Sequence, residues 1–172
     1  MSRSPKAPPA NVRLADIDEP LLAQLLELAL RDASPDEVTP PLGEGPDWNP
    51  ARIDWFRAYH RAAAAGLDGP AAEKSWAVLC GGEPAGCIRL KRTGKGNTAE
   101  TGIWLGRSYR GRGLGGAALA LGLVEARRAG LQEVVAHTTA ANTGAQRILT
   151  AAGATLTHDD DGAVGAVVVL SP

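Results

Sequence analysis

The stretch Glu100–Gly116 constrains the fold of this chain more than any other part of the sequence. A strand-like run, 98–105, enters a loop of glycines and arginines, and that loop opens a long helix rich in Ala and Leu, 112–129. A Val-rich strand, 133–139, follows. A strand–helix–strand unit of this kind forms a parallel pair with a right-handed crossover. The sequence therefore predicts an α/β protein with this parallel pair near the middle of its sheet.

The remaining pattern predicts further strands at 12–16, 75–80, 85–91, 154–157 and 164–170, and further helices at 20–30, 50–66 and 142–152. Short turns join neighbouring strands, so these strands should pair antiparallel. Residues 33–49, rich in Pro, Gly and acids, are read as one long loop, which in a compact domain is usually functional or disordered. We expect a single domain, 12–172, with a mixed, mostly antiparallel sheet and about four helices, after a disordered Pro-rich lead-in, 1–11.

Composition limits the classes of function. A net charge of −1 gives no argument for nucleic acid or an anionic membrane as partner. No apolar run approaches the roughly 20 residues of a membrane span, and the N-terminal stretch lacks the apolar centre of a signal peptide. Cys80 and Cys87 could face each other across a hairpin, but we favour two small buried thiols in a reducing cytoplasm. The cysteines and three histidines have no metal-ligand spacing, so no metal is expected.

The glycine loop predicts a site for a phosphate-bearing cofactor. Glycines let a backbone approach a ligand closely, and the first N–H groups of a helix are unpaired and bind phosphate. The guanidiniums of Arg110 and Arg112 add positive charge. Gly111, Gly113 and Gly116 also satisfy the dinucleotide pattern G-x-G-x-x-G, but the next strand ends without the acid that holds a ribose. A P-loop is rejected because no lysine follows the last glycine.

A third pattern, Arg110-Gly-Arg-Gly-Leu-Gly115, resembles the pyrophosphate loop of the GNAT family of N-acetyltransferases. The preceding Glu-x-Gly-x-Trp-Leu-Gly is similar to the branch of ribosomal-protein alanine acetyltransferases and polyamine acetyltransferases. The run from Asn142 to Gly153, Asn-x-x-Ala-x-Arg-Ile-Leu-x-x-x-Gly, resembles the final helix of that branch. The motifs cover residues 75–170, whereas 12–66 agree only in general layout.

The resemblance implies that acetyl-CoA lies in a V-shaped cleft between the two splayed parallel strands. Its pyrophosphate would bind the amides of 111–116, and a backbone N–H near Leu105 would polarise the thioester carbonyl. The cofactor-binding residues carried over in this way are Trp104, Leu105, Arg110, Gly111, Arg112, Gly113, Leu114, Gly115, Gly116 and Asn142. Asn142 is read equally well as a helix cap. Homodimers are common in the family.

The implied reaction is direct attack of an amine on the thioester, which needs a base to take a proton from the ammonium. Glu100 is the candidate, since an acid inside an apolar strand is costly without a task or partner. A strand-edge carboxylate in solvent is the other reading, and Asp47, Asp54 and 159–161 are alternatives. Many family members carry a tyrosine in the last helix that protonates the thiolate. Leu149 stands at that position here, so the acid would be water near Asn142 or Thr139, or none.

Helix 50–66 and the loop before it hold most of the aromatic residues. Ile53, Phe56, His60 and Ala63 share one helix face, and Trp55, Tyr59 and Ala62 share a neighbouring one. One face should be core and the other either core or a wall for the acceptor. The predicted acceptor residues are Asp47, Trp48, Trp55 and Tyr59. Glu44 and Asp47, with Asp36 and Glu37 upstream, would attract a cationic amine, although acidic loops are also ordinary surface.

We therefore expect an acetyl-CoA-dependent N-acetyltransferase in the cytoplasm. Its predicted partner is a small cationic amine such as an amino acid or an aminoglycoside-like antibiotic. Acetylation of a protein N-terminus or lysine is the alternative. A CoA-binding sensor without turnover is a second alternative, because Leu149 lacks a proton to donate.

Overall fold

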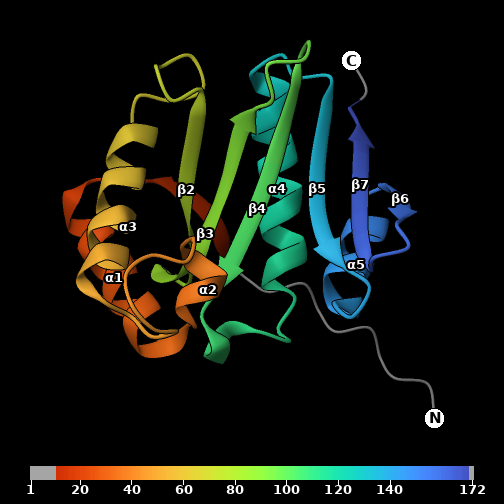
Figure 1. The fold of residues 1–172 in the computed structure, drawn as a ribbon. Helices are drawn as coiled ribbons and strands as arrows, with labels where there is room; N and C mark the ends of the chain where they lie inside the picture. Colours follow the sequence, from red (N-terminus) through yellow and green to blue (C-terminus); the bar gives the residue numbers. More distant parts are fainter. Residues whose placement is uncertain (1–10, 171–172) are drawn as a thin grey trace.

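The computed structural model describes residues 11–170, so residues 1–10 of the expected lead-in lie outside the described part. Seven strands form one sheet in the order β1-β2-β3-β4-β5-β7-β6 (Figure 1). They are β1 (Val12–Asp16), β2 (Glu73–Cys80), β3 (Glu83–Arg92), β4 (Thr98–Leu105), β5 (Glu133–Thr139), β6 (Thr155–His158) and β7 (Ala163–Val169). The β4–β5 pair is parallel and the other five neighbouring pairs are antiparallel. The predicted mixed sheet with a central parallel pair is confirmed.

The described helices are α1 (Glu19–Asp32), α2 (Pro35–Val38), α3 (Pro50–Ala63), α4 (Leu114–Arg128) and α5 (Thr143–Ala151), with a 3₁₀ turn, η1 (Arg107–Tyr109). The side chains of Asp18, Asn49 and Asn142 cap α1, α3 and α5 by accepting backbone N–H bonds. The expectation of about four helices is corrected, because α2 lies inside the segment predicted as loop. Ser34 and Glu37 form a capping box around its first turn.

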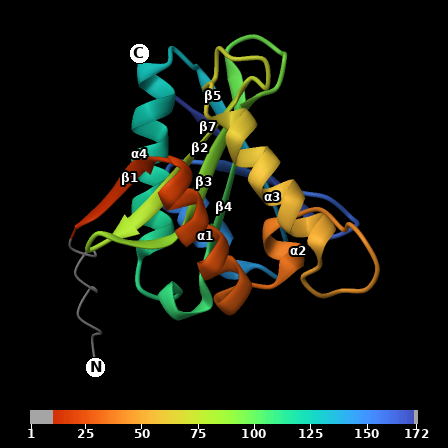
Figure 2. The same ribbon diagram turned by 90° about the vertical axis from the view of Figure 1, so that its left-hand side faces the viewer.

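Helices cover both faces of the sheet (Figure 2). On one face, α4 and α5 bury the larger core, which includes Ile88, Leu119 and Val134. On the other face, α1 and α3 bury a second core around Leu25 and Phe56. Trp104 packs against this second core, whereas Ile103 and Leu105 pack against the first, as strand alternation predicts.

The parallel pair separates along its length. Its register runs from Thr98 opposite Glu133 to Glu100 opposite Val135 and then ends, although both strands continue. Figure 1 shows β4 and β5 diverging toward their carboxyl ends. The expected splayed pair is therefore present, and the β4 backbone from Thr101 to Leu105 has no strand pairing on the β5 side.

The two cysteines do not face each other. Cys87 pairs with Ala77 and Cys80 with Glu83, and both thiols are free. Cys87 is buried, and this burial raises the pKa of its thiol. Within residues 11–170, no helix is long and apolar enough to cross a membrane.

Candidate active site

The N-terminus of α4 is open where the sequence predicted a phosphate site. Gly113 precedes the helix with φ of 79°, a left-handed conformation that favours glycine. A Cβ on Gly116 would meet no atom within 4 Å, so a ligand can reach the first-turn amides there. Gly115 has another role, since a Cβ there would lie 3.0 Å from Ile148 Cδ1 of α5. Gly116 thus leaves room for a ligand, whereas Gly115 allows α5 to pack closely against α4.

A cavity of about 940 Å³, here called the α4 cavity, lies between the splayed strands and the starts of α4 and α5. The predicted cofactor residues on its wall are Trp104, Leu105, Arg110, Gly111, Gly113, Leu114, Gly115, Gly116 and Asn142. Arg112 is the exception: it does not line the cavity, and its guanidinium lies 5.4 Å from the centre of the Tyr109 ring. The size and open amides of this cavity fit a cofactor with a diphosphate group.

Arg110 already has partners within the protein. Its Nη2 lies 2.7 Å from Glu37 Oε2 and 3.1 Å from the carbonyl oxygen of Leu105. The guanidinium lowers the pKa of Glu37 by donating this hydrogen bond. Next to this pair, Ser108 N donates to Asp32 Oδ2 at 3.0 Å. The end of α1 and the start of α2 are thus fastened to the loop that precedes α4.

At the other end of the α4 cavity, Asn142 caps α5 by accepting a 3.0 Å hydrogen bond from Ala145 N. The capping role is therefore present, and the side chain also lines the cavity. Leu149 lines the same cavity and is buried. An apolar side chain therefore occupies the position that the sequence analysis matched to a proton-donating tyrosine. Thr101 and Thr138 also line this cavity, and the Thr101 hydroxyl donates to Arg89 O at 2.9 Å.

A second cavity of about 720 Å³, here called the α3 cavity, lies on the opposite face of β4. Its floor comes from β2, β3 and β4, and α2 and α3 supply walls. Register places Glu73, Lys91 and Glu100 in one row across the three strands, and Ser75, Arg89 and Gly102 in the next. Gly102, Ile103 and Trp104 line both cavities, so one short part of β4 separates them.

The floor of the α3 cavity carries an ionic network. Arg89 Nη2 lies 3.0 Å from Glu100 Oε1, and its Nη1 lies 3.8 Å from Glu73 Oε2. Tyr59 donates its hydroxyl hydrogen to the same Glu73 oxygen. Burial is the main reason why the pKa of Tyr59 is raised, and the hydrogen bond to Glu73 is the second reason. The phenol therefore stays protonated. Glu73 is 7% exposed, whereas the Glu100 side chain is 37% exposed, so Glu100 is the more accessible carboxylate.

Aromatic rings form the α3 side of this cavity. Trp55 and Tyr59 stack with ring centres 4.9 Å apart, and both line the cavity, as one of the two sequence readings proposed. Phe56 on the neighbouring helix face is fully buried. Trp48 instead packs into the second core and donates its indole N–H to Ala33 O, and Asp47 is exposed. Neither Asp47 nor Trp48 lines the α3 or the α4 cavity.

Three charged residues of this site were not singled out from the sequence: Arg52, Glu73 and Arg89. Glu37 was expected only as part of an acidic loop, although the serine-to-glutamate capping pattern at 34–37 was a readable signal for α2. Glu73 and Arg89 carry no such signal, because they meet only when β2, β3 and β4 pair. Among the described residues, no group of three or more His, Cys, Asp or Glu side chains could hold a metal ion.

An open helix N-terminus beside a splayed parallel pair defines an α/β protein built for a phosphate-bearing cofactor, with a second cavity across β4. The sequence matches the acetyltransferase (GNAT) family over residues 23–154. The chain therefore belongs to the GNAT family and is an acetyl-CoA-dependent N-acetyltransferase. No match is found among curated proteins by sequence.

Solved structures share this fold. RimL, a ribosomal L7/L12 α-N-protein acetyltransferase in complex with coenzyme A, has 16% identity and a TM-score of 0.74, over 96% of this chain and 97% of that one. RimJ from Mycobacterium smegmatis, in complex with a CoA disulfide, has 20% identity and a TM-score of 0.71, over 92% and 81%. The GNAT domain of S. lividans PAT has 21% identity and a TM-score of 0.68, over 92% and 89%. At these identities the likeness shows the fold alone.

Proposed function

We propose that this chain acetylates the primary amine of a small cationic molecule that enters the α3 cavity. One observation carries the proposal: Gly102, Ile103 and Trp104 wall both cavities. An acetyl group held along β4 from the α4 side would then be within reach of an amine on the α3 side. In the neighbouring structures of RimL and RimJ, the printed ligands are coenzyme A and its disulfide, which supports the α4 cavity as the cofactor site.

On the cofactor side, the diphosphate would bind the first-turn amides of α4, with Gly116 leaving room for it. Arg110 would exchange Glu37 for a phosphate oxygen. The pantetheine arm would run along the unpaired edge of β4 near Trp104 and Leu105, with Asn142 on the far wall. These residues would hold and orient the cosubstrate and leave deprotonation of the ammonium to the α3 side.

On the acceptor side, Glu100 is the proposed base. It would take a proton from the ammonium, and the freed nitrogen lone pair would attack the acetyl carbon. A C–N bond forms as the C–S bond breaks, and the electron pair leaves on the thiolate of CoA. After this attack the nitrogen still carries a second proton to lose. Because Leu149 offers no proton, water carries that proton from the nitrogen to the thiolate, and Glu100 later releases its own proton to solvent. Arg89 keeps the Glu100 carboxylate at the cavity floor through their 3.0 Å contact.

The charge on the whole lining of the α3 cavity favours a cationic acceptor. The lining has four carboxylates and three cationic side chains, a surplus of one negative charge: Asp36, Glu37, Glu73 and Glu100 against Arg89, Lys91 and Arg92. The stacked rings of Trp55 and Tyr59 offer a π face for an ammonium, which is worth about 0.5–2 kcal/mol depending on desolvation. We place the reaction in the cytoplasm, in keeping with the two free thiols.

Acetylation of a protein N-terminus is the second candidate. The fold likeness to RimL, which carries α-N-protein acetyltransferase in its name, favours it. A peptide would need a path across the wall formed by Asp36, Thr39 and Pro40. A sensor that binds CoA without turnover is the third candidate.

Thiol release from acetyl-CoA, followed against a panel of small amines and of peptides with free N-termini, tests the proposal. We expect release with a cationic small amine, with a catalytic efficiency at least tenfold above that of any peptide. Faster release with a peptide would favour the second candidate. CoA binding by calorimetry together with no release from any acceptor would favour the sensor.

A further inference from the structure

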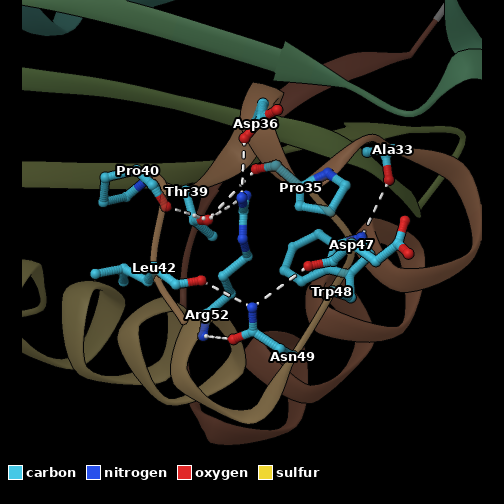
Figure 3. Close-up of polar contacts among 10 residues, drawn as sticks. All are labelled: Ala33, Pro35, Asp36, Thr39, Pro40, Leu42, Asp47, Trp48, Asn49 and Arg52. Carbon is cyan, nitrogen blue, oxygen red and sulfur yellow. Dashed lines mark hydrogen bonds and ion pairs between the residues drawn. The ribbon is translucent and has the colours of Figure 1, made fainter. Parts of the chain in front are cut away.

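Arg52, in the first turn of α3, is one of the most buried side chains of the protein, at 2% exposed. Its Nη2 lies 3.0 Å from Asp36 Oδ1, and its Nη1 donates to Thr39 Oγ1 at 3.3 Å (Figure 3). Within the described residues, its Nε is buried without a hydrogen-bond partner. Burying a cation is costly even when it is paired, so the packing of an apolar core does not explain this side chain.

The guanidinium organises a segment that has little regular structure. Thr39 Oγ1 donates in turn to the carbonyl oxygen of Pro40 at 2.9 Å. Asn49, which caps α3, accepts from Arg52 N through Oδ1 and donates through Nδ2 to Leu42 O at 2.8 Å. Figure 3 shows these groups converging from the segment onto the start of α3. The first turn of α3 therefore fixes the path of residues 35–42.

Five consecutive residues of that segment, 36–40, line the α3 cavity, whereas Arg52 does not. The Arg52 guanidinium contacts this wall at Asp36 and Thr39. We propose that Arg52 is a positioning residue that holds the 36–40 wall in the shape that the acceptor requires. This inference rests on the proposed function, in which the α3 cavity takes the acceptor.

The same wall reaches the cofactor side through Glu37, which lines the α4 cavity as well and forms an ion pair with Arg110. Loosening the wall would weaken this pair and leave Arg110 available for phosphate. The inference therefore gives the two substrates different expectations. Binding of the acceptor should weaken when Arg52 is replaced, and binding of CoA should not.

Arg52→Gln and Arg52→Lys test the inference. Lysine keeps a charge for Asp36 but cannot bridge Asp36 and Thr39 as a fork does. The control is Arg61→Gln on the same helix, where the arginine is exposed and forms a 2.8 Å ion pair with Glu19. Two readouts are used: hydrogen–deuterium exchange at the amides of residues 36–39, which needs no acceptor, and KM for the most reactive amine of the panel.

We expect amide exchange of residues 36–39 to speed up at least fivefold in Arg52→Gln, with exchange in α4 unchanged. In Arg52→Gln, KM for the amine should rise at least tenfold, while the calorimetric Kd for CoA rises less than twofold. In Arg52→Lys, the rise in KM should be about half as large on a logarithmic scale. Asp36→Asn should raise KM by a smaller factor in the Arg52→Gln variant than in the parent protein, because the two residues act through one contact.

Unchanged amide exchange at 36–39, or an acceptor KM within twofold of the parent, would overturn the inference. An equal rise in CoA Kd, or the same KM change in Arg61→Gln, would also overturn it, because the effect would then be a general loss of stability. These outcomes differ from failure of the proposed function, in which the parent protein itself transfers no acetyl group to any small amine.

Discussion

Glu100 and Arg89 lie on neighbouring strands, and register alone would set Glu100 beside Lys91. The Arg89 guanidinium reaches diagonally to Glu100, across the position of Gly102. A Cβ at Gly102 would lie 3.0 Å from Arg89 Nε, so even an alanine there would press on the guanidinium. Because Gly102 has no side chain, there is room for the ion pair between Arg89 and Glu100. The floor of the α3 cavity also stays free of a side chain beside Trp104. These residues hold Glu100 at the floor of the α3 cavity.

Glu100→Gln isolates the basic function of this carboxylate. Glutamine keeps the size of the side chain and an oxygen for Arg89 to bind, but it cannot take a proton. We expect kcat to fall by about 10²-fold, within the range typical of a lost general base. The measurement is thiol release at saturating amine and acetyl-CoA, with Glu83→Gln, an exposed carboxylate of β3, as control. A rate within twofold of the parent would assign the proton transfer to another group.

At the scale of elements, the N-terminus of α4 combines two roles that one substitution can separate. Gly116 lies in the first turn with open space where a Cβ would stand. Replacing a helical glycine by alanine stabilises a helix by about 0.5–1 kcal/mol, because glycine loses more backbone entropy on folding. The same methyl group would occupy the approach of a diphosphate to the amides.

We therefore expect Gly116→Ala to raise the melting temperature and to weaken CoA binding about tenfold, which is about 1.4 kcal/mol. Thermal unfolding and titration calorimetry measure the two effects. Ala120→Gly, at an exposed position of the same helix, should lower the melting temperature and leave CoA affinity unchanged. Equal CoA affinity in Gly116→Ala and the parent would move the diphosphate away from this turn.

The elements were largely predictable because their limits are set by neighbouring residues. Proline and asparagine start α3, and a glycine with positive φ precedes α4, so both helices can be located from sequence. The short helix α2 was missed because its prolines and acids read as loop composition. Its capping pattern was present, but four residues are too few to show the hydrophobic periodicity that indicates a helix.

The acceptor side of the site was less predictable, for a physical reason. Glu73, Arg89 and Arg52 act through partners 11 to 16 residues away in the chain. In a sequence, each looks like an ordinary surface charge at the end of a strand or in the first turn of a helix. Trp48 was expected at the acceptor, but the second core offers its ring apolar contacts and Ala33 O accepts its N–H. Only the assembled tertiary structure distinguishes these cases.

At the scale of the whole molecule, buried His60 joins the α3 layer to the sheet. His60 Nδ1 lies 2.8 Å from Ser75 Oγ of β2, and the Phe56 ring packs edge-on against the imidazole at 4.6 Å. Burial lowers the pKa of His60 to about 4, so the ring is neutral when the protein is folded at neutral pH. An unfolded chain would bind that proton near pH 6.5. Folding and protonation of this side chain therefore oppose each other.

The sign of the resulting pH dependence follows from linkage. Between pH 6.5 and about 4 the unfolded state binds more protons at His60 than the folded state does, so the free energy of unfolding falls as pH falls. A depression from 6.5 to about 4 corresponds to a loss of about 3 kcal/mol, complete near pH 4. His60→Gln should lower stability at pH 7.5 and flatten this slope, whereas His158→Gln, at an exposed position, should leave it unchanged. Urea unfolding at half-unit steps from pH 7.5 to 4.5 measures both, and parallel profiles for His60→Gln and the parent would show that His60 is not the group that titrates.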